Sequence, residues 1–170
     1  MLVKQAQYSF EDYLQHNTTS EHRYELVEGE LRLINPSTVR YFLIAKYLEA
    51  CFEREIKNQS LPWFYLREAG VRTGWQESRL AYLFITDREQ VSQKLDQTAI
   101  VQVAPLLPVE IVSPDSKKRD YCHKRSQYVA IGLLEYWIVV PDKNTVTVLT
   151  LEDGFYEEMI VAQSDNLVSV

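Results

Sequence analysis

The chain has 170 residues, of which 46% are hydrophobic and 25% are charged, and its formal net charge is −6. We expect a single domain over residues 1–170, because this length supports one hydrophobic core. No apolar run approaches the roughly 18 residues of a membrane-spanning helix, and residues 1–10 do not resemble a secretory signal, so we expect a cytoplasmic protein without membrane contact. The negative charge argues against coating nucleic acid through the whole surface, although it permits a local basic site.

The first part of the chain contains two helix signals and one hairpin signal. Ser9 followed by Asp12 predicts a helix start and a short helix over 10–16. Alternating residues on either side of a Glu-Gly turn predict a β-hairpin over 23–34. The longest predicted helix covers about 38–57, and its apolar residues recur at helical spacing: Tyr41, Ile44, Leu48, Cys51, Phe52 and Ile56.

The remainder alternates between strand patterns and one further helix. Strands are predicted over 63–67, 69–73, 80–86, 107–113, 135–140, 145–151 and 155–161. The strands at 80–86 and 107–113 are apolar at both odd and even positions, which is typical of central strands covered on both faces. A helix capped by Asp115 or Ser116 is predicted over about 117–131. This order predicts a mixed α/β fold, with a central mixed sheet flanked by helices.

Three charged residues stand where the pattern favours apolar ones. Glu110 lies in the middle of a predicted core strand, where an ionised carboxylate costs several kcal/mol unless it is paired or binds a cation. Glu25 repeats this anomaly in the first hairpin. Lys124 falls on the tyrosine-rich face of the last predicted helix, so it must reach solvent or find a buried anion. Because the strand with Glu110 leads into that helix, Glu110 is the expected partner of Lys124.

Each of these residues also has a purely structural interpretation. Glu25 could face solvent from an edge strand, Glu110 could form a structural ion pair, and Lys124 could be a solvated helix lysine. Together, however, two carboxylates and a lysine are the parts of a metal-dependent hydrolase. The basic residues around the start of the last helix could be solvated or could contact nucleic-acid phosphates: Lys117, Lys118, Arg119 and Arg125.

Four segments, in this order, allow comparison with known families: RYELVEGE at 23–30, PVEIVSP at 108–114, DYCHKRSQY at 120–128 and EYWIV at 135–139. They resemble the Uma-two (Uma2) family of small bacterial proteins described as restriction endonucleases. The similarity spans about residues 8–156 and implies a restriction-endonuclease-like core of the PD-(D/E)xK nuclease type. The resemblance also implies that such a protein cleaves DNA and forms a homodimer.

The resemblance assigns roles to individual positions. Glu25 and Glu110 correspond to metal-binding acids, and Lys124 with Glu110 corresponds to the catalytic pair. The implied cofactor is Mg²⁺ or Mn²⁺, held by oxygen ligands and several waters. The implied nucleic-acid contacts are made by the basic residues named above, at the start of the helix after Glu110.

One position departs from the family pattern. The family has a Pro-Asp pair at the start of its central strand, and here Ala81-Tyr82 stands in that place. A neutral phenol is a poor Mg²⁺ ligand, and we expect the ring of Tyr82 to fill the space of the ion. The sequence therefore predicts a metal-dependent DNA endonuclease with impaired catalysis. The alternative is an inactive nuclease-fold protein that binds nucleic acid or another protein and needs no cofactor.

Overall fold

A computed structural model describes residues 7–113 and 116–162. The helices are α1 (Phe10–Thr19), α2 (Val39–Asn58), α3 (Arg88–Ser92) and α4 (Arg125–Ala130), and a π-helical turn, η1 (Arg119–Lys124), leads into α4. The strands are β1 (Tyr24–Val27), β2 (Glu30–Leu33), β3 (Trp63–Gly74), β4 (Glu77–Asp87), β5 (Ile100–Val101), β6 (Leu107–Ile111), β7 (Glu135–Val140), β8 (Thr145–Glu152) and β9 (Phe155–Ala162).

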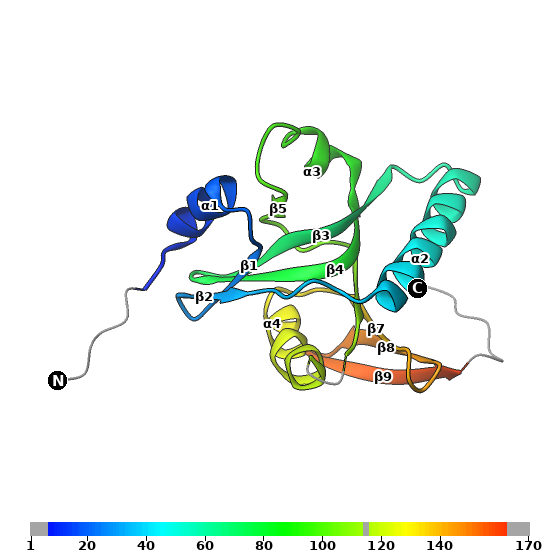
Figure 1. The fold of residues 1–170 in the computed structure, drawn as a ribbon. Coiled ribbons are helices and arrows are strands. Elements are labelled where there is room, and N and C mark those ends of the chain that lie inside the picture. Colours follow the sequence, from blue (N-terminus) through cyan, green and yellow to red (C-terminus); the bar gives the residue numbers. More distant parts are fainter. Residues whose placement is uncertain (1–6, 114–115, 163–170) are drawn as a thin grey trace.

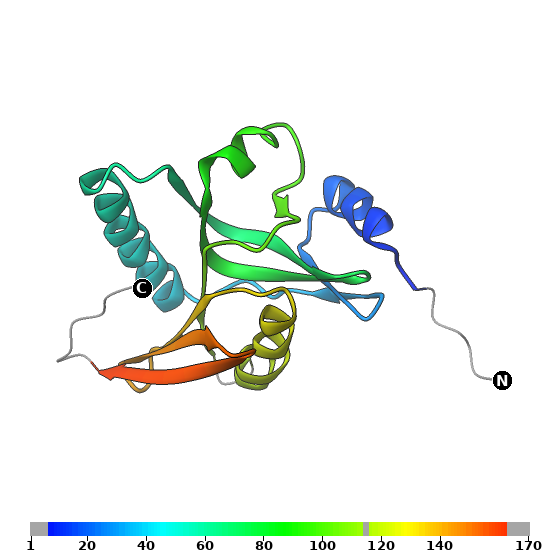
Figure 2. The same ribbon diagram turned by 180° about the vertical axis from the view of Figure 1, so that it is seen from behind.

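The strands form one mixed sheet. Within the described ranges, its nine strands follow the order β2-β1-β4-β6-β7-β8-β9, while β3 pairs with β4 and with the short β5. β6 and β7 run parallel, as do β3 and β5, and the β3–β4 pair is a long antiparallel hairpin. Figures 1 and 2 show this hairpin between α1 and α2, which lie at opposite ends of the molecule. The predicted α/β class with a mixed sheet and flanking helices is confirmed.

The local signals of the first 58 residues are confirmed. At the start of α1, the backbone nitrogen of Asp12 donates to Ser9 Oγ at 3.1 Å, and the backbone nitrogen of Ser9 donates to Asp12 Oδ2 at 2.9 Å. This reciprocal cap satisfies two backbone donors that the helix leaves free. The predicted hairpin forms β1 and β2, and α2 lies within one residue of its predicted bounds. Among the described residues, no helix is long and apolar enough to cross a membrane.

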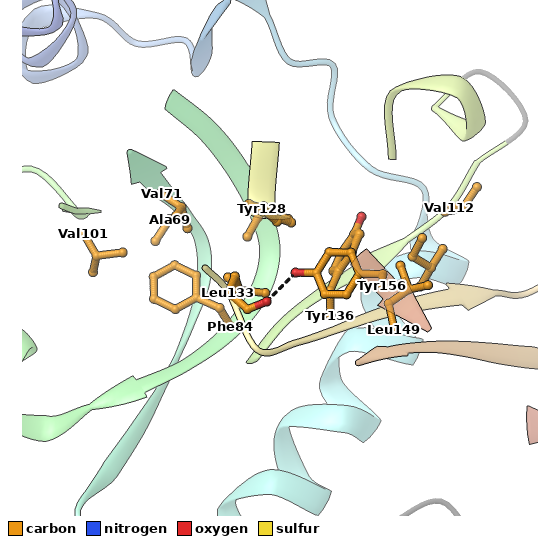
Figure 3. Close-up of a cluster of buried hydrophobic side chains, with 12 residues drawn as sticks. Ala69, Val71, Phe84, Val101, Val112, Tyr128, Leu133, Tyr136, Leu149 and Tyr156 are labelled. Atoms are coloured by element: carbon orange, nitrogen blue, oxygen red, sulfur yellow. Dashed lines mark hydrogen bonds between the residues drawn. The ribbon is translucent and has the colours of Figure 1, made fainter. Parts of the chain in front are cut away.

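Apolar side chains form a separate cluster on each side of the sheet. The α2-side cluster joins Ala45 and Phe52 of α2 to residues of β4, β6, β7 and β8, among them Leu83, Val109 and Trp137. The α4-side cluster is drawn in Figure 3 and contains three buried tyrosines, Tyr128, Tyr136 and Tyr156. The Tyr156 hydroxyl donates to the Leu133 carbonyl at 2.7 Å, the dashed line in that figure. Burial on both faces explains why the segments 80–86 of β4 and 107–113, which includes β6, are apolar at both odd and even positions.

The β3–β4 hairpin changes the direction of its side chains halfway along its length. Ala81 belongs to the α4-side cluster, whereas Leu83, two residues later, belongs to the α2-side cluster. Regular alternation would place both on one face. On the neighbouring strand, Glu68 has a left-handed backbone, with a φ angle of +50°. Glu68 and Tyr82 face each other between the paired residues Arg67–Leu83 and Ala69–Ala81, so the change of direction occurs at that position in both strands.

The second half of the chain differs from the prediction in three places. The two strands predicted at 63–67 and 69–73 are one strand, β3, and the irregular residue Glu68 lies where they were separated. The helix predicted over about 117–131 is present, but its residues 119–124 form the π-helical turn η1 ahead of α4, which was not predicted. The short α3 and β5 were not predicted. Of the two predicted caps, Asp115 lies outside the described residues, and Ser116 exchanges hydrogen bonds with Ser113.

Candidate functional site

The site lies at a gap in the pairing along one edge of β4. β1 pairs with β4 at Ser78, and β6 pairs with the same strand from Leu83 to Ile85. In the described part of the chain, neither strand pairs with residues 79–82 between these two contacts. Backbone groups in a buried gap need other hydrogen-bond partners, because leaving them unpaired costs free energy.

Charged side chains supply those partners. The backbone nitrogen of Leu80 donates to Glu25 Oε1 at 3.1 Å, and the carbonyl oxygen of Leu80 accepts from Lys124 Nζ at 2.7 Å. The backbone nitrogen of Tyr82 lies 3.4 Å from Glu110 Oε2. The three charged residues singled out in the sequence therefore meet at one place on β4, from β1, β6 and η1.

Lys124 stands at the centre of this group. Its Nζ lies 2.8 Å from Glu110 Oε1, 3.3 Å from Glu25 Oε1 and 3.5 Å from Asp120 Oδ1. Lys124 and Glu25 are each 1% exposed, and Glu110 is 4% exposed. The solvated interpretations of Glu25 and Lys124 are therefore wrong, since both side chains are inside the protein and paired.

Three further polar residues belong to the site and were not assigned to it from the sequence: Arg79, Gln127 and Asp120. Arg79 holds Glu25 from the other side, with 3.2 Å between Nη1 and Glu25 Oε2, and its Nε donates to Gln127 Oε1 at 2.5 Å. Asp120 is 1% exposed and is also paired with Arg119, at 3.3 Å. The residues next to Arg79 and Asp120 in the sequence are typical of a strand edge and of a helix surface. The sequence therefore gives no local signal that these two side chains are buried.

Burial and neighbouring charges shift the pKa values of the site in different directions. Burial raises the pKa of Glu110 to about 7, although Lys124 opposes the shift. Burial works in the same direction on Glu25, but Lys124 and Arg79 outweigh it, and the pKa of Glu25 is lowered. Burial disfavours the ammonium of Lys124, yet Glu110 and Glu25 prevail and raise its pKa. Lys124 is thus a cation, and Glu110 is the carboxyl group that titrates near neutral pH.

Tyr82 does not occupy the site in the way the sequence suggested. Its ring packs with the α2-side cluster, so the expectation that the ring fills the space of an ion is wrong. The reason is the change of direction opposite Glu68, which turns residue 82 toward α2 and lets the ring join apolar neighbours. Burial also raises the pKa of the Tyr82 phenol, which therefore stays neutral.

The residues present do not fit a divalent cation in this arrangement. Mg²⁺ requires oxygen ligands at about 2.0–2.1 Å in near-octahedral geometry. Here an ammonium stands between the carboxylates, and position 82 directs no acid toward them. Within residues 7–113 and 116–162, no group of three or more His, Cys, Asp or Glu side chains is arranged to hold a metal. No catalytic step through Mg²⁺ or Mn²⁺ follows from this geometry.

The four basic residues near the start of the last helix have different surroundings. Lys117 and Lys118 are exposed. The side chain of Arg119 is 40% exposed and is paired with Asp120. Arg125 is bound within the molecule, because its guanidinium donates to Glu158 at 3.0 Å and to the Tyr156 carbonyl at 2.9 Å. Lys117 and Lys118 are therefore the members of the group with the freest access to an external phosphate.

Comparisons with known proteins agree with this fold. A solved structure described as a putative nuclease belonging to DUF820, from Anabaena variabilis, aligns with a TM-score of 0.72 over 89% of this chain and 83% of that chain. Its sequence identity is 20%, so this likeness supports the fold. No curated protein matches the chain. The model of the Uma2 family, described as "Putative restriction endonuclease", matches residues 10–170. The chain therefore belongs to the Uma2 family.

Proposed function

We propose that this chain is a nuclease-fold protein whose metal-dependent cleavage of DNA is impaired by the loss of the carboxylate at position 82. The observation that carries this proposal is the meeting of Glu25, Glu110 and Lys124 at β4, without an acid from position 82. Two acids and a lysine are parts of a metal-dependent phosphodiesterase, in which the metal activates water and offsets charge on the phosphate.

The proposed impairment has two physical causes. The site lacks one oxygen ligand for Mg²⁺ or Mn²⁺, because the Tyr82 ring packs toward α2. The lysine that would stabilise charge on a phosphate is also committed internally, since Lys124 is 1% exposed and is surrounded by four oxygen atoms. A phosphodiester can benefit from an ammonium only if it reaches hydrogen-bond distance.

The test restores the missing acid. The backbone nitrogen of Tyr82 is 3.4 Å from Glu110 Oε2, so a short carboxylate at residue 82 can turn to Glu110 once no ring holds the side chain in the α2-side cluster. Tyr82→Asp should therefore bind Mn²⁺ in calorimetry and nick supercoiled plasmid DNA, whereas Tyr82→Phe, the matched control, should do neither. Adding Lys124→Ala to the Asp variant should abolish nicking.

Two results would contradict the proposal. Cleavage by the unmodified protein that disappears in Glu110→Gln would show that catalysis is not impaired. If neither the folded Tyr82→Asp variant nor its Lys124→Ala double variant binds Mn²⁺, residue 82 does not belong to the site.

A second candidate function is binding of nucleic acid without catalysis. It is favoured by the exposed ammonium groups of Lys117 and Lys118 close to a closed, internally paired site. Replacing both lysines with alanine should weaken DNA binding and reduce the slope of log affinity against log salt by about 2, because each phosphate contact contributes about 0.9. An unchanged slope would favour a protein partner instead.

A further inference from the structure

We infer that the ammonium group of Lys124 is the resident cation of this site, and that the unmodified protein binds no divalent metal at Glu25 and Glu110. This inference deepens the proposed function, because it assigns the impairment to an occupied cation position as well as to a missing ligand. It also gives the cluster a role of its own, which is to join β1, β4, β6 and η1 across the gap in the sheet.

The first support is the coordination of Nζ. Its neighbours are the Leu80 carbonyl oxygen at 2.7 Å, Glu110 at 2.8 Å, Glu25 at 3.3 Å and Asp120 at 3.5 Å. An ammonium has three donors and no acceptor, and here the Leu80 carbonyl and Glu110 accept hydrogen bonds from it while Glu25 and Asp120 lie at ion-pair distance. A divalent ion at this position would have to displace the ammonium into a buried environment, where an unpaired charge is costly.

The second support is the balance of charge. The acids Glu25, Glu110 and Asp120 carry at most three negative charges, and three cations face them, which are Lys124, Arg79 and Arg119. A buried cluster without net negative charge offers a divalent cation little electrostatic gain to offset the loss of its hydration.

The third support is the commitment of the acids to the backbone. Glu25 accepts from the Leu80 nitrogen, and Glu110 lies beside the Tyr82 nitrogen, so the carboxylates replace the strand pairing that β4 lacks here. Ligation of a metal would compete with these hydrogen bonds. The cluster therefore acts as an internal connection between strands.

The inference predicts that removing the ammonium creates a divalent-cation site. In Lys124→Ala the three acids and the Leu80 carbonyl remain, and the cluster acquires a net negative charge. The variant should bind Mn²⁺ about 100-fold more tightly than the unmodified protein, or more. Lys143→Ala removes an exposed lysine and is the matched control for charge.

The experiment titrates Mn²⁺ into the three proteins and follows binding by calorimetry and the midpoint of thermal unfolding. We expect Mn²⁺ to raise the midpoint of Lys124→Ala and to leave the unmodified protein and Lys143→Ala unchanged. If Lys124→Ala folds only when Mn²⁺ is present, that result also supports the inference.

Saturable binding of Mn²⁺ to the unmodified protein that is lost in Glu110→Gln would overturn the inference, and so would a folded Lys124→Ala variant that does not respond to Mn²⁺. If Lys124→Ala fails to fold under every condition, the titration of the unmodified protein alone tests the inference. Absence of saturable Mn²⁺ binding then supports it, and binding that depends on Glu110 overturns it. DNA cleavage is not a readout here, so the proposed function stands or falls separately on the Tyr82→Asp variant.

Discussion

Replacing Lys124 with methionine is expected to destabilise the protein strongly. Methionine retains much of the apolar stem but removes the ammonium that neutralises Glu110 and Glu25, at 2.8 and 3.3 Å. Removing one partner of a buried ion pair costs about 3–5 kcal/mol, because the other charge stays buried without compensation. This is a large share of the roughly 5–15 kcal/mol by which folded domains are stable.

Urea unfolding of four proteins separates the ion pair from simple loss of packing. The proteins are the unmodified chain, Lys124→Met, Glu110→Gln and the double variant. Because the double variant removes one charge of each sign, its free energy of unfolding should exceed the value expected from adding the two single losses. The loss in Lys124→Met should also shrink as the pH falls and the buried acids become protonated. A loss below about 1 kcal/mol, the range of exposed ion pairs, would refute this reasoning.

Two further predictions concern groups in and beside the site. Burial raises the pKa of Glu110 from its ordinary 4.5 to about 7, so its contribution to stability is present below pH 4.5 and is lost as the pH rises through 7. The free energy of unfolding of the unmodified protein, relative to Glu110→Gln, should fall by about 3 kcal/mol across that interval in urea titrations, and a flat difference would contradict the assignment. The buried hydroxyl of Tyr128 has no hydrogen-bond partner among the described residues, so Tyr128→Phe should raise the free energy of unfolding by about 1 kcal/mol. A loss of stability in that variant would indicate a partner for the hydroxyl.

The local elements of the fold could be predicted because their signals lie within a few residues. The Ser9 and Asp12 cap, the hairpin of β1 and β2, and the apolar stripe of α2 depend on neighbours in sequence. The π-helical turn η1 has no comparable signal, and its form is tied to the contacts of Lys124 in the interior. The irregularity at Glu68 was equally hidden, because its left-handed φ is usual for glycine or asparagine and glutamate gives no signal for it.

The amino-acid sequence by itself determined the family, the α/β class and the anomaly of Glu25, Glu110 and Lys124, since a charge in an apolar segment can be recognised without coordinates. Only the tertiary structure decided which charges compensate one another. Asp120 and Arg79 join the cluster through space, and the Tyr82 ring leaves it because the hairpin changes direction opposite Glu68. Electrostatic pairing depends on distance and burial, and both arise when strands far apart in sequence meet.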